Sequence, residues 1–153
     1  PGFAEAWLAL GLSYARSGRA ESARPCFEKA LALDPGNPAA SFIFAEFLSG
    51  NGDSARAAAL YRAALDLEPG YLEAWVNLGA LYRDQGNYAK ARACYEKAVA
   101  LAGRDPVPFY SYGLLLEKIG EPLRAQALYL EALSRNPGYG PARAALERRK
   151  RRD

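Results

Sequence analysis

Residues 4–37 read AEAWLALGLSYARSGRAESARPCFEKALALDPGN, and residues 72–105 read LEAWVNLGALYRDQGNYAKARACYEKAVALAGRD. The two stretches share a tryptophan, a Leu-Gly pair, a tyrosine, an alanine, an aromatic residue and a second alanine at the same places. Recurrence of this kind at a fixed period indicates an array of supersecondary units, each too small to bury its own apolar face.

Pro-Gly pairs mark the period along the chain. They begin at Pro1, Pro35, Pro69 and Pro137, so the intervals are 34, 34 and 68 residues. The missing pair falls at Gly103-Arg104, where the spacing is kept although the proline is replaced. We therefore divide the chain into repeats 4–37, 38–71, 72–105 and 106–139, with residues 140–153 beginning a fifth.

Each repeat has the pattern of two helices. Trp7, Leu10, Gly11 and Tyr14 lie at i, i+3, i+4 and i+7, which places them on one side of an α-helix. Ala23, Phe27 and Ala30 form the matching stripe of a second helix. A glycine inside a helix costs about 1 kcal/mol, a cost that is offset if its missing side chain lets the second helix come close.

Turn residues separate the helices at constant places. A glycine falls between the two stripes of every repeat, and a proline follows the second stripe of most of them. The glycines are Gly18, Gly52, Gly86 and Gly120; the prolines are Pro35, Pro69 and Pro137. Glycine is the usual residue at a helix C-terminus and proline cannot continue a helix, so each repeat is predicted to be a helical hairpin.

The pattern resembles the tetratricopeptide repeat over nearly the whole chain. The second and fourth repeats depart from it at packing positions, with Ser41 in the place of tryptophan and Phe44-Ala45 in the place of Leu-Gly, while Phe109 and Tyr112 replace Trp and Leu. The resemblance implies an all-α fold, a right-handed α-solenoid of antiparallel helix pairs, formed as one domain over residues 1–153.

The two ends are expected to differ. Pro1-Gly2-Phe3 has the sequence of the tail of an earlier repeat, so we expect the chain to be a segment of a longer array. Residues 140–153 are expected to form a capping helix, with Arg143 in the tryptophan position and one face in water. Phe3, Tyr71 and Tyr139 precede the first helices and are interpreted as hydrophobic staples.

The net positive charge of the chain comes from one short segment. The whole chain carries 20 Lys and Arg against 17 Asp and Glu, but residues 1–142 hold 14 against 15. The excess lies in the run from Arg148 to Arg152, which fits the cations found at a helix C-terminus. Nucleic-acid binding rests on this run alone and is the less favoured interpretation.

The sequence lacks the residues that several classes of functional site require. The chain has no histidine, and its two cysteines are too few for a Cys/His metal site. We find no glycine-rich phosphate loop, no nucleophile with a base and no paired carboxylates, so we expect neither catalysis nor a cofactor. No apolar run reaches the ~20 residues of a membrane-spanning helix.

Cys26 and Cys94 occupy the same place two repeats apart, where the other repeats have Leu60 and Leu128. A whole hairpin separates them, which exceeds the ~7 Å between Cα atoms that a disulfide allows. They are interpreted as packing residues, and unpaired cysteines favour a reducing, cytoplasmic compartment.

The face of each first helix opposite the buried stripe is richer in apolar residues than a solvated face. The resemblance implies that this face lines a concave groove and binds a peptide or a segment of a partner protein. The candidate peptide-binding residues are Leu8, Leu12, Phe42, Glu46, Glu73, Val76, Asn77, Arg83, Tyr110 and Leu114. Packing against neighbouring first helices is the alternative explanation for Leu8, Phe42 and Tyr110.

The residues of this face limit the kinds of ligand that it could bind. Asn77 can donate to and accept from a peptide backbone, but Ala9, Ile43 and Ser111 stand at the same place, so there is no asparagine ladder. The cations of a chaperone carboxylate clamp are missing in either frame, where Leu8, Leu12 and Glu73 or Phe42, Glu46 and Val107 would stand. An apolar or amphipathic segment, carrying Lys or Arg, is the expected ligand.

The favoured function is thus a protein–protein interaction module with an adaptor or scaffold role. Two alternatives remain open at this point. The chain could self-associate as a homo-oligomer, or it could be the substrate-targeting domain of a larger enzyme.

Overall fold

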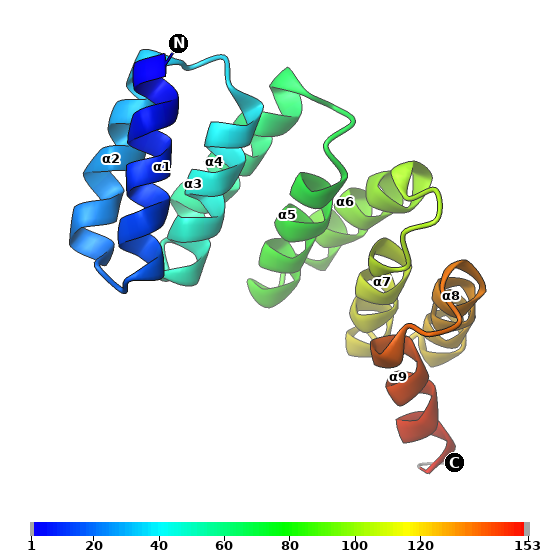
Figure 1. Ribbon diagram of the computed structural model, residues 1–153. Helices are drawn as coiled ribbons and strands as arrows, with labels where there is room; N and C mark the ends of the chain where they lie inside the picture. Colours follow the sequence, from blue (N-terminus) through cyan, green and yellow to red (C-terminus); the bar gives the residue numbers. More distant parts are fainter. Residues whose placement is uncertain (1, 152–153) are drawn as a thin grey trace. The chain divides into compact units, whose positions relative to one another are not determined.

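The computed structural model describes residues 2–151, and the backbone in this range forms nine α-helices and no strand (Figure 1). The helices are α1 (Gly2–Arg16), α2 (Ala20–Leu33), α3 (Pro38–Gly50), α4 (Ser54–Leu67), α5 (Leu72–Asp84), α6 (Tyr88–Leu101), α7 (Val107–Lys118), α8 (Pro122–Arg135) and α9 (Gly140–Lys150). Successive helices pack as antiparallel hairpins, one in each predicted repeat. None of these helices is both long and apolar enough to cross a membrane.

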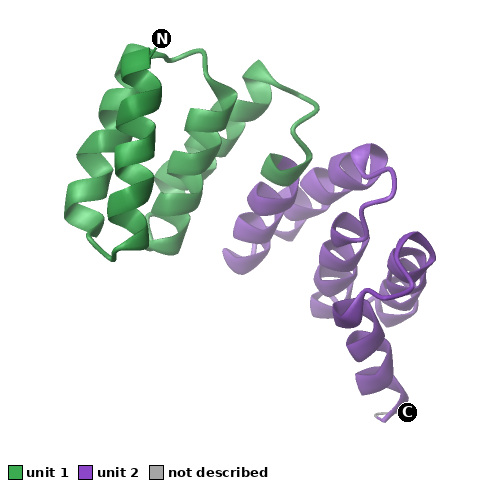
Figure 2. Cartoon of the chain, viewed as in Figure 1, with its two compact units in different colours: residues 1–74 green, residues 75–153 purple. Residues whose placement is uncertain are grey.

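The chain divides into two compact units, residues 1–74 and residues 75–153 (Figure 2). Unit 1 contains the hairpins α1–α2 and α3–α4, and α2 packs on α3. Unit 2 contains most of α5, then α6, the hairpin α7–α8 and the single helix α9. In unit 2, α6 packs on α7 and α8 packs on α9.

The predicted turn glycines adopt the backbone conformation that only glycine accepts easily. Gly18, Gly52, Gly86 and Gly120 have φ angles of 73°, 84°, 76° and 79°. A side chain on the residue would be strained there, so glycine at this place ends the first helix and reverses the chain. The prediction of helix-ending glycines is confirmed.

The core repeats every 34 residues. In each second helix two alanines and the aromatic residue between them are almost completely buried, and their exposed fractions do not exceed 2%. The aromatic residues are Phe27, Tyr61, Tyr95 and Tyr129; the alanines are Ala23, Ala30, Ala57, Ala64, Ala91, Ala98, Ala125 and Ala132. Small residues on both sides of a ring let two helices approach closely around it, which is the packing that the repeat pattern predicts.

Glycines in three first helices lie directly against these rings. A Cβ atom built on Gly11 would lie 2.8 Å from Phe27 Cδ1, and one on Gly79 would lie 2.8 Å from Tyr95 Cε1. Real Cβ atoms do not approach carbon atoms so closely. The second hairpin has Ala45 at this place, fully buried, so its ring and helices are arranged around a methyl group.

Two predicted positions of the first helix differ from expectation. Leu10, assigned to the buried stripe, is 39% exposed. Phe3 does not precede the first helix, since α1 begins at Gly2, and its side chain is 81% exposed. It therefore makes no hydrophobic staple.

The predicted capping helix is present as α9. It buries Ala142 and Ala145 and exposes Arg143 and Arg148. Arg143 also donates a hydrogen bond of 2.7 Å to the carbonyl oxygen of Pro137. Arg152 and Asp153, which belong to the predicted element, lie outside the described residues.

We expect Gly79→Ala to lower the free energy of unfolding by about 1–3 kcal/mol, the usual cost of overpacking a tight core. The added methyl group must displace the Tyr95 ring, although alanine by itself favours a helix. Urea denaturation followed by circular dichroism would measure the change. Gly50→Ala is the matched control, because nothing lies within 4 Å of its Cβ position, and it should be neutral or stabilising.

We expect Cys94 to be chemically inert in the folded protein. Its side chain is 5% exposed, and burial raises the pKa of the Cys94 thiol to about 11. Because only the thiolate reacts, iodoacetamide at pH 8 should label Cys94 far more slowly in the native protein than in urea, as measured by mass spectrometry. Equal labelling rates in the two conditions would mean that the thiol is accessible.

Candidate peptide-binding faces

An aromatic trio supports the first-helix face of unit 1. Phe42 of α3 stacks on Tyr71, with ring centroids 4.7 Å apart, and lies 5.7 Å from Tyr61 of α4. Only 9% of Phe42 is exposed. Tyr71 thus packs on the first helix of the preceding hairpin, a contact that the interpretation as a staple did not include.

Unit 2 repeats the trio. Tyr110 of α7 lies 5.7 Å from Tyr129 of α8 and 5.7 Å from Tyr139, measured between ring centroids. Each residue stands 68 positions after its counterpart in the first trio. Neither trio was predicted from the sequence, although the aromatic residues after three of the four Pro-Gly pairs, Phe3, Tyr71 and Tyr139, were the signal that could have revealed them.

Carboxylates surround the trio of unit 1. The pKa of Tyr71 is raised by burial and then by the negative charges of Glu73, Glu68 and Glu46. Glu46 and Glu73 are both exposed. This face therefore presents negative charge beside an aromatic platform.

Unit 2 has hydrogen-bond donors on its first-helix face. The Arg83 side chain is 19% exposed, and its Nε donates to Asp84 Oδ1 at 2.9 Å. Burial lowers the pKa of Arg83, but the hydrogen bond to Asp84 and the nearby hydroxyl groups of Tyr95 and Tyr110 raise it overall. Tyr110 is within electrostatic reach of Arg83, which connects the faces of α5 and α7.

The hydroxyl group of Tyr95 is buried without a hydrogen-bond partner among the described residues. The same ring contacts Gly79, one helical turn before Arg83. Burial raises the pKa of Tyr95 to about 12. An orphaned hydroxyl group usually costs stability, and the first repeat avoids that cost with Phe27 at this place.

The ten predicted binding residues fall into two groups of five. Unit 1 holds Leu8, Leu12, Phe42, Glu46 and Glu73; unit 2 holds Val76, Asn77, Arg83, Tyr110 and Leu114. In unit 1, Phe42 stacks on Tyr71, and the charges of Glu46 and Glu73 act on the Tyr71 hydroxyl group. In unit 2 the link between Arg83 and Tyr110 is electrostatic. The apolar members are half-buried, except for Phe42, which is buried.

The structure corrects the expectation of a large exposed apolar face on the first helices. None of the ten residues belongs to the large hydrophobic side chains that are clearly exposed among the described residues. Most of those side chains lie on the second helices, at Leu33, Leu67, Tyr88, Leu101, Leu123 and Leu130. Of the ten residues, Phe42 and Tyr110 pack against neighbouring rings.

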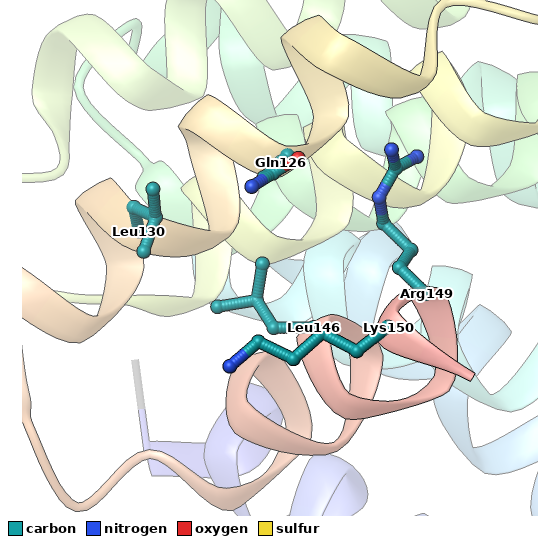
Figure 3. A pocket seen from close by; sticks show the side chains of 5 residues that line it. All are labelled: Gln126, Leu130, Leu146, Arg149 and Lys150. Atoms are coloured by element: carbon teal, nitrogen blue, oxygen red, sulfur yellow. The ribbon is translucent and has the colours of Figure 1, made fainter. Parts of the chain in front are cut away.

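Two hollows lie on other surfaces. A hollow of about 340 Å³ between α2 and α4 has Leu31, Phe44 and Leu60 in its wall, and the Arg56–Glu28 ion pair of 3.0 Å at its edge. A smaller pocket of about 150 Å³ lies between α8 and α9 (Figure 3). No group of three or more His, Cys, Asp and Glu residues suited to a metal ion occurs within residues 2–151.

Known proteins resemble this chain in both sequence and fold. The family described as the cytochrome c-type biogenesis protein H TPR domain matches residues 1–104. The crystal structure of MamA superposes with a TM-score of 0.81 and 25% identity, covering 88% of this chain and 78% of that one. No curated protein matches the sequence.

Two further structures share the fold. PilF of Pseudomonas aeruginosa has a TM-score of 0.79 and 23% identity, with 95% of this chain and 74% of that chain covered. A chain of the APC/C hetero-tetramer Cut9-Hcn1 has a TM-score of 0.77 and 25% identity. The superposition covers 88% of this chain and 26% of that chain. The paired helices are therefore those of a tetratricopeptide-repeat fold, as the repeat pattern predicted.

We expect Tyr95→Phe to raise the free energy of unfolding by about 1 kcal/mol at neutral pH, because it removes a buried donor that has no partner. The raised pKa of Tyr95 also makes the free energy of unfolding depend on pH. Below pH ~10 the hydroxyl group is protonated in both states, and above it the unfolded chain ionises first, so stability falls as the pH rises toward about 12.

Denaturant unfolding at pH 7 and across the alkaline range would measure both effects. As the pH rises, the free energy of unfolding should fall less in Tyr95→Phe than in the parent protein. Tyr88→Phe is the control, since this side chain is 37% exposed and the change should stay within ~0.5 kcal/mol. A loss of stability in Tyr95→Phe at pH 7 would show that the hydroxyl group has a partner.

Proposed function

Because the chain belongs to the family of the cytochrome c-type biogenesis protein H TPR domain, we propose that it is an adaptor that binds a segment of a partner protein. Domains of this kind are generally interaction modules without catalytic activity. The binding surface in this proposal is the first-helix face of each unit, which the resemblance assigns to the concave side. The aromatic trio with charged groups beside it, present in both units, is the observation that carries the proposal.

The trios act as rigid supports in this proposal. Phe42 is too deeply buried to contact a ligand over much of its surface, and its stacking on Tyr71 holds α3 and the start of α5 in place. In unit 2, Tyr110 is only half-buried and can both support the face and contact the ligand. Tyrosine and arginine are the residues that most often dominate binding energy at interfaces.

In unit 1 the proposed ligand group is a lysine or an arginine. Glu46 and Glu73 are exposed and lie close enough to Tyr71 to raise its pKa. A cation held between them also stacks readily on the ring of a nearby tyrosine. Leu8 and Leu12 of α1, both half-buried, supply aliphatic surface for an apolar neighbour of that cation.

In unit 2 the proposed ligand groups are a main-chain amide and an oxygen acceptor. Asn77 can donate and accept at once, whereas Arg83 can only donate. Val76 and Leu114 are half-buried and offer apolar contacts beside them. The chemistry of both faces thus favours an amphipathic segment that carries a basic residue.

The comparisons support a protein partner. The family description names cytochrome c-type biogenesis, so a c-type cytochrome polypeptide is the first natural candidate. Cut9-Hcn1, which contains a chain of the same fold, is described as a hetero-tetramer. Both point to association with another chain.

A peptide-display selection against the whole chain, followed by fluorescence anisotropy with the enriched peptides, tests the proposal. We expect Glu46→Gln with Glu73→Gln, and separately Asn77→Ala with Arg83→Gln, to weaken binding about tenfold or more, as loss of central contacts does. A c-type cytochrome polypeptide should compete with the labelled peptides.

Glu5→Gln with Glu21→Gln is the control for charge, since both carboxylates are exposed and neither contributes to the raised pKa of Tyr71. It should leave the affinity unchanged. Circular dichroism must show equal folding of all variants. If folded chain enriches no peptide, or if both double variants bind as well as the parent, the first-helix faces are not the binding site.

A further inference from the structure

The pocket between α8 and α9 combines apolar walls with positive charge. Leu130 of α8 and Leu146 of α9 form its apolar part, and Gln126, Arg149 and Lys150 complete the lining (Figure 3). Its volume is about 150 Å³. An apolar cavity of about this size accommodates a benzene molecule, so the pocket fits one large apolar side chain.

The charge at this pocket is not balanced nearby. Arg148, Arg149 and Lys150 follow one another in the last turn of α9, and Arg151 caps it. No acidic side chain among residues 2–151 forms an ion pair with any of these four. The one described carboxylate on α9 is the exposed Glu147.

An exposed apolar stripe continues from the pocket along α8. Leu123 and Leu130 are 77% and 53% exposed, and with Gln126 they stand at i, i+3 and i+7, on one side of the helix. Interaction with the helix dipole explains cations in a last turn, but it does not explain two exposed leucines beside them. Leucines with arginines around them are typical of a surface that a partner covers.

We infer that the α8–α9 pocket binds an acidic amphipathic helix of a partner protein. A phenylalanine or leucine of that helix fills the space between Leu130 and Leu146, and its aspartate or glutamate residues pair with Arg149 and Lys150. Gln126 is able to hydrogen-bond polar groups at the margin. Charge complementarity selects the acidic partner and speeds its association.

The apolar pocket favours a protein over a nucleic acid as the occupant. Phosphate groups would use Arg148, Arg149, Lys150 and Arg151 alike, because backbone contacts depend on charge and not on an apolar cavity. A helix with one apolar anchor instead uses the two residues that line the pocket. This surface lies on α8 and α9, so the inference does not depend on the first-helix faces.

The probe is a fluorescein-labelled, alanine-based helical peptide that carries one phenylalanine, with glutamates three and four residues to either side. Its affinity for the whole chain is measured by anisotropy at low salt. Leu130→Glu and Arg149→Glu should each weaken binding about tenfold or more. Replacing the phenylalanine of the peptide by alanine should have a similar effect.

The matched controls carry the same change of charge outside the pocket. Arg148→Glu controls for Arg149→Glu on the same helix, and Leu33→Glu, at a leucine of α2 that is 51% exposed and does not line the pocket, controls for Leu130→Glu. Each control should weaken binding less than about threefold, the effect of an exposed charge. Thermal unfolding followed by circular dichroism checks that all four variants fold like the parent.

Three results would overturn the inference. The first is that the parent protein does not bind the phenylalanine peptide. The second is that Arg148→Glu weakens binding as much as Arg149→Glu, which would mean attraction without a pocket. The third is that a single-stranded oligonucleotide binds more tightly than the peptide and its affinity is unchanged by Leu130→Glu, which would assign the basic helix to nucleic acid.

Discussion

The contact between a glycine of the first helix and an aromatic ring of the second helix sets the geometry of this protein. In the first and third hairpins the glycine Cα faces the ring so closely that a methyl group would lie 2.8 Å from a ring carbon. The distance between the two helices follows from that contact, because the flanking alanines leave no other side chain to separate them. The second hairpin has the buried Ala45 in place of the glycine, so its ring packs around a methyl group instead.

The next layer of packing repeats as well. Tyr71 reaches back to Phe42, and Tyr139 reaches back to Tyr110, over the same number of residues. Each ring thus joins the chain between two hairpins to the first helix of the preceding one. The cluster removes most of the aromatic surface from solvent, and it leaves charged groups such as Glu46 and Arg83 at its margin. A face with such a rigid apolar base loses little conformational entropy when it binds a ligand.

Charge is distributed unevenly over this regular scaffold. Ion pairs join Arg56 of α4 to Glu28 of α2, and Arg92 of α6 to Glu121 at the start of α8. The cations at the end of α9 form no ion pair with an acidic side chain among residues 2–151. The surface beside Tyr71 and the surface at the end of α9 carry charges of opposite sign, so they suit partner segments of different chemistry.

The repeat period, the hairpins, their turns and their core were all determined by the sequence alone. A 34-residue period constrains Gly18, Gly52, Gly86 and Gly120 and the alanine–aromatic stripes at once, because a local conformation and a helical periodicity are properties of short segments. The tertiary structure decided which side chains remain accessible. Phe42 was predicted to contact a ligand but is buried by Tyr61 and Tyr71, while Leu130, assigned no role, is exposed beside the cations of α9. Accessibility depends on residues far apart in the chain, and a helical wheel contains no information about them.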